Sequence, residues 1–150
     1  MIRKRTQARE YAVQILYRLE INPGVIADSL DEFWSSPEQK DVSREVRDFA
    51  EAIVTGTRNH VAEIDQVVDQ YADNWSIDRM AVIDRNILRC ATYEILFSAD
   101  IPPKVTINEA VNLAKKFSQE ESGKFVNGIL DKIAHTEKPR VAKADESQNT

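Results

Sequence analysis

The stretch AREYAVQILYRL, residues 8–19, decides the class of fold because its apolar side chains recur every three or four residues. That spacing places them on one face of an α-helix. The face is made of Ala8, Tyr11, Ala12, Ile15, Leu16 and Leu19. Asn22, Pro23 and Gly24 follow closely and predict the end of this helix, because proline and glycine do not readily continue the backbone hydrogen bonds.

The same helical spacing recurs downstream, whereas the alternation typical of strands persists nowhere in the sequence. We expect a short helix over residues 25–34 and a long helical segment over residues 43–74, which Gly56 kinks or divides. The sequence therefore predicts an all-α protein, a bundle of six or seven helices.

Polar residues mark the starts of the later helices. Ser76 and Ser122 are predicted N-caps, because a serine hydroxyl can accept a hydrogen bond from the first turn of a helix. Thr106 and Glu109 have the spacing of a capping box, which predicts a helix that begins at Thr106. From residue 136 onward the chain has no apolar period, so we expect a helical domain over residues 1–135 and a disordered polar tail over residues 136–150.

The composition excludes several classes of protein. The chain has 150 residues, 42% of them hydrophobic and 30% charged, which suits one soluble domain or two tightly joined half-domains. Its one cysteine, Cys90, excludes an intramolecular disulfide and fits a reducing compartment, so we expect a cytoplasmic protein. The longest apolar runs are too short to span a membrane.

Motifs of the common enzyme classes are missing from the sequence. It contains no glycine-rich phosphate-binding loop, no zinc-protease motif and no nucleophile elbow. His60 and His135 lie far apart and lack companions at metal-ligand spacing, and Cys90 lies beside an apolar stripe where a buried thiol is expected. We therefore expect no catalytic residues, no cofactor and no metal.

The charge is strongly polarised along the chain. The net charge is −5, yet residues 1–18 carry five basic side chains and one acidic side chain, whereas residues 19–103 carry seven basic and seventeen acidic ones. Local charge steers ligands more than the total does. This distribution allows nucleic acid at the basic end and a basic protein elsewhere.

Four basic residues form an N-terminal arm: Arg3, Lys4, Arg5 and Arg9. A solvated, flexible terminus is the simpler interpretation. However, Arg5 and Arg9 are four residues apart, so a helix that starts early would place them on one face, away from the stripe of Ala8, Tyr11 and Ala12. Guanidinium groups on that face suit phosphate contacts.

A second candidate segment precedes the last helix. Phe125 is one residue off the apolar stripe and lies beside Lys124, so its ring is either a boundary core residue or a surface on which an unpaired base stacks. Glu121 would then accept a hydrogen bond from a base edge.

Four segments of the chain stand out together. They read AREYAVQILY at residues 8–17, ILRCATYE at 87–94, VTINEAVNLAKKF at 105–117 and KFVNGILDKI at 124–133. In this order they resemble the NusB family of bacterial transcription antitermination factors. The resemblance implies a non-enzymatic protein of two helical half-bundles. It also implies binding to boxA RNA together with NusE, a ribosomal protein, within the RNA polymerase antitermination complex that reads through terminators in ribosomal RNA operons.

The family's functional residues carry over to matching positions of this sequence. The resemblance assigns RNA contacts to Arg3, Lys4, Arg5 and Arg9 of the arm and to Glu121, Lys124 and Phe125, and it assigns partner contacts to Tyr17, Asp78 and Asp84. The arm departs from the family pattern where Thr6 and Gln7 interrupt the arginine run, and Ser118 replaces a common helix-ending glycine.

Two other interpretations remain open at this stage. One is a protein-interaction bundle, a homodimer without direct RNA binding. The other is the RNA-binding domain of an RNA-modifying enzyme, against which the lack of a cofactor-binding segment after residue 135 argues.

Overall fold

The computed structural model describes residues 3–73 and 75–140, and it divides into two compact units at residue 60. Seven α-helices and two short 3₁₀ helices, η1 and η2, account for the secondary structure of these described residues, among which there is no strand. The predicted all-α bundle in two halves is thus confirmed.

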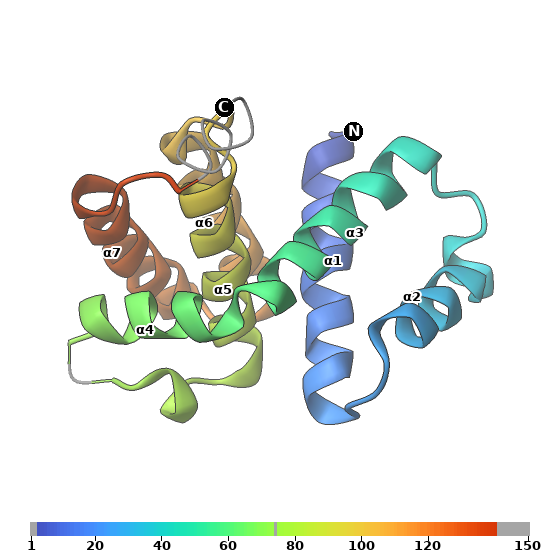
Figure 1. Cartoon of the computed structure of the whole chain (residues 1–150), viewed down its shortest axis with the longest axis horizontal. Helices are drawn as coiled ribbons and strands as arrows, with labels where there is room; N and C mark the ends of the chain where they lie inside the picture. Colours follow the sequence, from blue (N-terminus) through green and yellow to red (C-terminus); the bar gives the residue numbers. More distant parts are fainter. Residues whose placement is uncertain (1–2, 74, 141–150) are drawn as a thin grey trace, which may run out of the picture. The chain divides into compact units, whose positions relative to one another are not determined.

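The first unit contains α1 (Lys4–Ile21), α2 (Ile26–Ser35), η1 (Pro37–Gln39) and α3 (Arg44–Asn59), shown in blue to green in Figure 1. Within it α1 packs mainly against α3. The predicted apolar face of α1 is largely buried, because Ala8, Ala12, Ile15, Leu16 and Leu19 are each at most 3% exposed. The rings of Tyr11, Phe33 and Trp34 meet edge to face at 5.0–5.7 Å between centroids and join α2 to α1.

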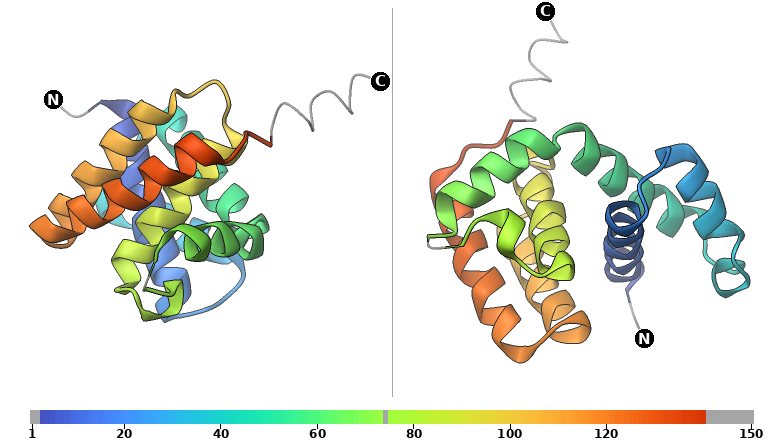
Figure 2. Two further views of the ribbon diagram at one scale, coloured as in Figure 1. Left: turned by 90° about the vertical axis from the view of Figure 1, so that its left-hand side faces the viewer. Right: turned by 90° about the horizontal axis from the view of Figure 1, so that it is seen from below.

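The second unit contains α4 (Val61–Tyr71), η2 (Ile77–Arg79), α5 (Val82–Phe97), α6 (Pro103–Phe117) and α7 (Glu120–Thr136). Figure 2 shows α5, α6 and α7 gathered into one bundle, in which α6 and α7 share the largest contact. Its core consists of branched aliphatic side chains that are at most 5% exposed: Ile64, Val68, Ile87, Leu88, Ile95, Leu96, Val126, Ile129, Leu130 and Ile133.

The long segment predicted over residues 43–74 is two helices, but Gly56 does not divide it. The first helix runs through Gly56 to Asn59, and the break falls at His60, whose backbone (φ −117°, ψ 19°) leaves the helical region. A single glycine costs a helix only about 1 kcal/mol, which the packing of Ile53, Val54 and Thr57 around it can outweigh.

The predicted capping hydroxyls have other partners. Helix α6 begins at Pro103, one turn before Thr106, because proline at the first helical position has its backbone already set. Thr106 is 1% exposed and donates a 3.1 Å hydrogen bond to Oε1 of Glu94, which is itself 2% exposed. The hydroxyl therefore satisfies a buried carboxyl group between α5 and α6 instead of capping a helix.

The serine caps were also predicted wrongly. Gln119 is the N-cap of α7, and the helix begins at Glu120, so Ser122 lies inside its first turn. Ser76 precedes η2, where the Asp69 carboxylate accepts the Ile77 N–H at 2.6 Å. An aspartate from the preceding helix thus takes the role that the sequence suggested for the serine.

The segment after α7 is held against α4 and α5 as far as residue 140. The Tyr71 hydroxyl donates to Oε2 of Glu137 at 2.6 Å, and the Arg140 guanidinium pairs with Glu63 at 2.8 Å. This hydrogen bond raises the pKa of Tyr71 and lowers the pKa of Glu137. The tail was predicted from residue 136, which is the last residue of α7, and its residues 141–150 lie outside the described residues.

Candidate nucleic-acid interface

The basic arm is the start of α1. Arg3 precedes the helix in an extended conformation, and Arg3, Lys4 and Arg5 are all exposed. The first turn of α1 contains no acidic side chain, so the positive end of the helix dipole reinforces the three cations. Lys4 forms a 3.0 Å ion pair with Glu45 of α3, but both groups are more than 60% exposed, so water and salt weaken the pair. A phosphate can therefore compete for the Lys4 ammonium.

Arg5 and Arg9 lie on one face, as their spacing predicted, and that face is turned toward Phe49. The prediction that this face lies away from the buried side of α1 is wrong for Arg9. Their guanidinium carbons lie 4.6 Å and 5.4 Å from the centre of the Phe49 ring. The two arginines differ in exposure, because Arg5 is exposed whereas Arg9 is 5% exposed. Arg5 is thus positioned by the ring at the surface, and Arg9 is part of the packing beneath it.

A groove in the second unit brings together three of the other predicted residues, Asp84, Glu121 and Phe125. Glu121, Ser122 and Phe125 of α7 line it together with Asp84 of α5, and the segment between α4 and α5 supplies Trp75, Arg79, Met80 and Ala81. Phe125 is half-buried, at the edge of the apolar stripe as its position predicted, and Lys124 beside it is exposed. Glu121 lies in the first turn of α7 and is exposed.

Asp84 joins the start of α5 to the start of α7. Its Oδ2 accepts a 3.2 Å hydrogen bond from Ser122, whose Oγ also lies 3.0 Å from the Ser118 hydroxyl. Its Oδ1 is buried and has no hydrogen-bond partner within the described part of the chain. Ser118, which replaces a common glycine, therefore takes part in the turn through its side chain.

Gly123 permits the close approach of α6 to the start of α7. A Cβ atom at this position would lie 3.1 Å from Cγ and 3.2 Å from Cε of Lys115, which crosses over the glycine. The Lys115 ammonium reaches to 4.0 Å from Glu120. The glycine thus lets a lysine stem lie flat against α7 and directs its charge toward the acidic first turn.

Asp78 lies at the surface of η2 near this groove. Nη1 of Arg85 donates to the backbone carbonyl oxygens of Asp78 and Met80, at 3.2 Å and 3.4 Å, and so fixes η2 to α5. The Asp78 carboxylate is left exposed. Asp78 and Asp84 therefore belong to one loop–helix junction that Arg85 holds together.

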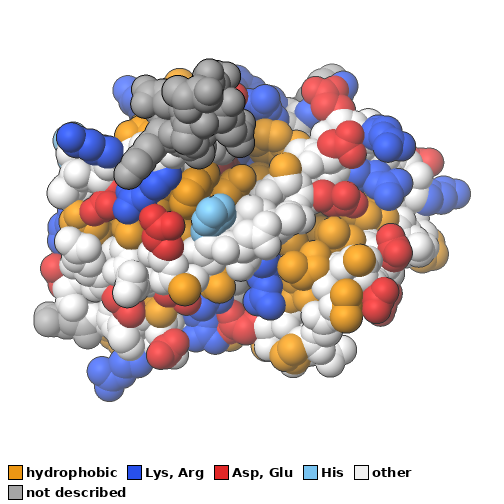
Figure 3. Space-filling model, in the orientation of Figure 1, with side chains coloured by type: hydrophobic (Ala, Val, Ile, Leu, Met, Phe, Trp, Pro, Cys, Tyr) orange, Lys and Arg blue, Asp and Glu red, His pale blue; other side chains and the backbone are white. Residues whose placement is uncertain are grey.

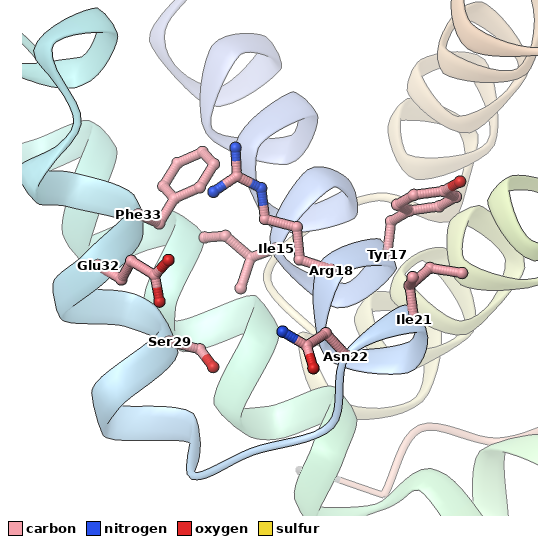
Figure 4. Close-up of a pocket in the computed structure, with 8 residues that line it drawn as sticks. All are labelled: Ile15, Tyr17, Arg18, Ile21, Asn22, Ser29, Glu32 and Phe33. Atoms are coloured by element: carbon pink, nitrogen blue, oxygen red, sulfur yellow. The ribbon is translucent and has the colours of Figure 1, made fainter.

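Tyr17 belongs to the first unit, beside a pocket between α1 and α2 (Figure 4). Arg18 reaches over the Phe33 ring at 5.0 Å, whereas Tyr17 and Ile21 lie on the side of α1 away from Phe33. Tyr17 is 42% exposed, Ile21 60% and Val25 64%. Tyr17, Ile21 and Val25 are thus exposed apolar side chains of this unit, and further hydrophobic side chains are visible between α1 and α2 in the space-filling view (Figure 3).

The predicted residues thus fall into three places. Glu121, Phe125 and Asp84 share the groove, with Lys124 and Asp78 close in the chain; the arm and Tyr17 belong to the other unit. Trp75 and Arg79, which also line the groove, were not predicted from the sequence. The one available signal was a tryptophan outside every apolar stripe, in a linker where a large ring has no core to fill.

Within the ranges that the structure describes, no cluster of three metal-binding side chains occurs, and no helix is long and apolar enough to cross a membrane. Cys90 is buried, as predicted.

Comparison with known proteins identifies the chain. The model of the NusB family matches residues 6–135. The chain belongs to the NusB family. The transcription antitermination protein NusB of Anaeromyxobacter dehalogenans is 48% identical over 134 residues, which cover 89% of this chain and 92% of that protein. NusB of Thermodesulfovibrio yellowstonii is 44% identical over 142 residues, and the match covers 89% of this chain and 93% of that protein. This NusB-family member is accordingly an antitermination factor and not an enzyme.

Solved NusB structures share the fold. The T. maritima NusB structure has a TM-score of 0.82 at 36% sequence identity, and the match covers 93% of this chain and 96% of that structure. A crystal structure of the antitermination factors NusB and NusE in complex with double-stranded RNA has a TM-score of 0.80 at 30% sequence identity. The match covers 90% of this chain and 98% of the matched chain in that structure. The resemblance stated from four sequence segments is thereby confirmed for the family and the fold.

Proposed function

We propose that this NusB-family chain binds boxA RNA together with NusE and so promotes read-through in ribosomal RNA operons, in the cytoplasm, as part of the RNA polymerase antitermination complex. A relative that crystallised with NusE and RNA supports both partners. The observation that carries the proposal is that this chain has both a cluster of exposed cations and a groove with an aromatic ring and a carboxylate. Exposed cations at the start of α1 suit phosphates, and the groove with Phe125 and Glu121 suits an unpaired base.

The partner contacts are proposed at Tyr17, Asp78 and Asp84. Tyr17 lies in an apolar surface, and Asp78 presents an exposed carboxylate that suits a basic ribosomal protein. Asp84 lines the same groove as Phe125, so substitutions at Asp84 would affect either ligand. Asp78 is the better residue with which to test the partner separately.

The two ligands are expected to bind cooperatively. A net charge of −5 opposes RNA, and a basic partner bound near Asp78 and Asp84 would lower that repulsion. NusE should tighten RNA binding by a factor in the range of about 5–150, and RNA should tighten NusE binding by the same factor.

The experiment is a titration of labelled boxA RNA with and without NusE, on the wild type and on Asp78→Lys. Asp78→Lys should abolish the enhancement and leave the binding of RNA alone unchanged or slightly stronger. Asp100→Lys is the matched control, because it makes the same charge change at another exposed aspartate of the second unit. Equal RNA affinity with and without NusE would refute the cooperative mechanism.

A homodimer without direct RNA contact is the second candidate, and the exposed Tyr17, Ile21 and Val25 favour it. Light scattering of the free protein, with and without boxA RNA, decides between the two. A dimer whose mass does not change with RNA supports this candidate, whereas a protein–RNA complex supports the first.

A further inference from the structure

The groove of the second unit contains an exposed ring that the proposed function does not use. Trp75 is 53% exposed, whereas Trp34, the other tryptophan of the chain, is 7% exposed in the core of the first unit. Leaving half of an indole in water forgoes the favourable free energy of burying it. An exposed tryptophan that lines a groove is therefore a good candidate for a ligand contact.

The other walls of the groove supply the remaining chemistry for a nucleotide. Phe125 contributes a second aromatic ring, and Met80 with Ala81 contributes apolar surface. Bases stack on such rings whatever their sequence. Arg79 is an exposed cation that suits a phosphate, and two carboxylates, Asp84 and Glu121, suit the amino group of a base.

Asp84 has the acceptor that such a contact needs. Ser122 occupies Oδ2, whereas Oδ1 lacks a hydrogen-bond donor within the described part of the chain. A buried carboxylate oxygen without a donor is costly, and an amino group inserted beside it would supply one. A NusE contact at Asp84 would use the same carboxylate, but Arg79 favours a phosphate over a basic peptide inside the groove.

We propose that Trp75, Arg79 and Asp84 form, with Phe125, a subsite for one unpaired nucleotide of the RNA. The base stacks on Trp75, its exocyclic amino group donates to Asp84, and its phosphate faces Arg79. Adenine, cytosine and guanine have such an amino group, and uracil does not. The proposal rests on the proposed function and extends its groove from Phe125 to the loop that precedes α5.

Two measurements on boxA RNA test the subsite in the presence of NusE. Trp75→Ala should weaken RNA binding by about 5- to 150-fold, which corresponds to the loss of one stacked base. RNA should quench the tryptophan fluorescence of the wild type, and Trp75→Phe should lose the quenching yet keep most of the affinity, because a ring remains. Val105→Ala is the control, since Val105 is another exposed apolar residue of this unit, 44% exposed on α6.

An abasic scan of the RNA then identifies the nucleotide. Removing the base at the subsite position should weaken wild-type binding and should have no further effect on Trp75→Ala. Uridine at that position should bind the wild type more weakly than an amino-bearing base does, and Asp84→Asn should reduce this preference.

The outcomes separate the subsite from the function on which it rests. If wild-type protein with NusE fails to bind boxA RNA, both are refuted. If RNA binds and Trp75→Ala keeps full affinity and quenching, the subsite alone is refuted. If Trp75→Ala weakens NusE binding but not the binding of RNA alone, the groove is a protein site and the subsite is again refuted.

Discussion

Replacing Arg5 and Arg9 separately should give two different results, although the sequence places both in the same basic arm. Both guanidinium groups lie over the Phe49 ring, but Arg5 is exposed and Arg9 is 5% exposed. Arg5→Ala should remove a phosphate contact and leave the fold intact. Arg9→Ala should remove buried packing and leave a cavity beside Phe49.

The sizes of the two effects follow from this difference. Loss of one phosphate contact should change the slope of log affinity against log salt by about 0.7 for single-stranded RNA. For Arg9→Ala, a desolvated cation–π contact is worth about 2 kcal/mol, before the loss of the packed methylene groups. At this chain length each 1 kcal/mol lowers Tm by about 2–4 °C.

The assays are RNA titrations at four salt concentrations and thermal melting of the same preparations. Arg5→Lys and Arg9→Lys serve as matched controls, because lysine keeps the charge but loses the planar contact with the ring. Arg5→Lys should retain the salt slope, and Arg9→Lys should still lower Tm. Identical changes in salt slope and Tm for Arg5→Ala and Arg9→Ala would show that the division between surface and packing is wrong.

Three further predictions follow from other contacts. Phe125→Ala should weaken RNA binding by about 1–3 kcal/mol with a smaller loss in melting, and a large melting loss with intact RNA affinity would assign the ring to the core. Thr106→Val should lower the free energy of unfolding in urea by about 1–3 kcal/mol, because buried Glu94 loses a hydrogen-bond donor. Thr106→Ser keeps the hydroxyl and should keep most of that stability. Equal stability of the valine and serine variants would count against the hydrogen bond between Thr106 and Glu94. The hydrogen bond from Tyr71 to Glu137 should contribute its full stability above the ordinary pKa of a carboxyl group, and this stability should be lost as the pH falls through the lowered pKa of Glu137. Tyr71→Phe should remove that part of the dependence of the unfolding free energy on pH. An unchanged dependence in Tyr71→Phe would contradict this role of the hydrogen bond.

The helices were predictable because their apolar spacing is repeated over several turns. The period of Ala8, Ile15 and Leu19 reports which face is buried, and packing of that face supplies most of the stability of a helix. Helix starts were less predictable. Thr106 and Ser122 have the right side chains for capping, but each hydroxyl satisfies a carboxyl group on another helix, which the local sequence does not reveal.

The candidate site was predictable only in part, and the reason is physical. Phe125 stands out because a helical period defines an edge, and a ring at that edge is half-buried. Trp75 and Arg79 lie in and beside an irregular segment without a period, so their meeting with α7 depends on the tertiary packing of η2. Arg9 was predicted to be exposed and is buried instead. A count of charges cannot separate it from Arg5, because its burial depends on packing.

The ion pair between Arg140 and Glu63 joins residues that are 77 positions apart, and this separation bears on how the chain folds as it leaves the ribosome. The contacts of the first unit, such as Lys4 with Glu45, are complete once its 59 residues have emerged. By contrast, Glu63 must wait until another 77 residues have been synthesised before its arginine exists. Synthesis at about 5–20 residues per second gives the first unit a lead of several seconds. The amino-terminal unit can therefore acquire its structure, basic arm included, while the other unit is still being made.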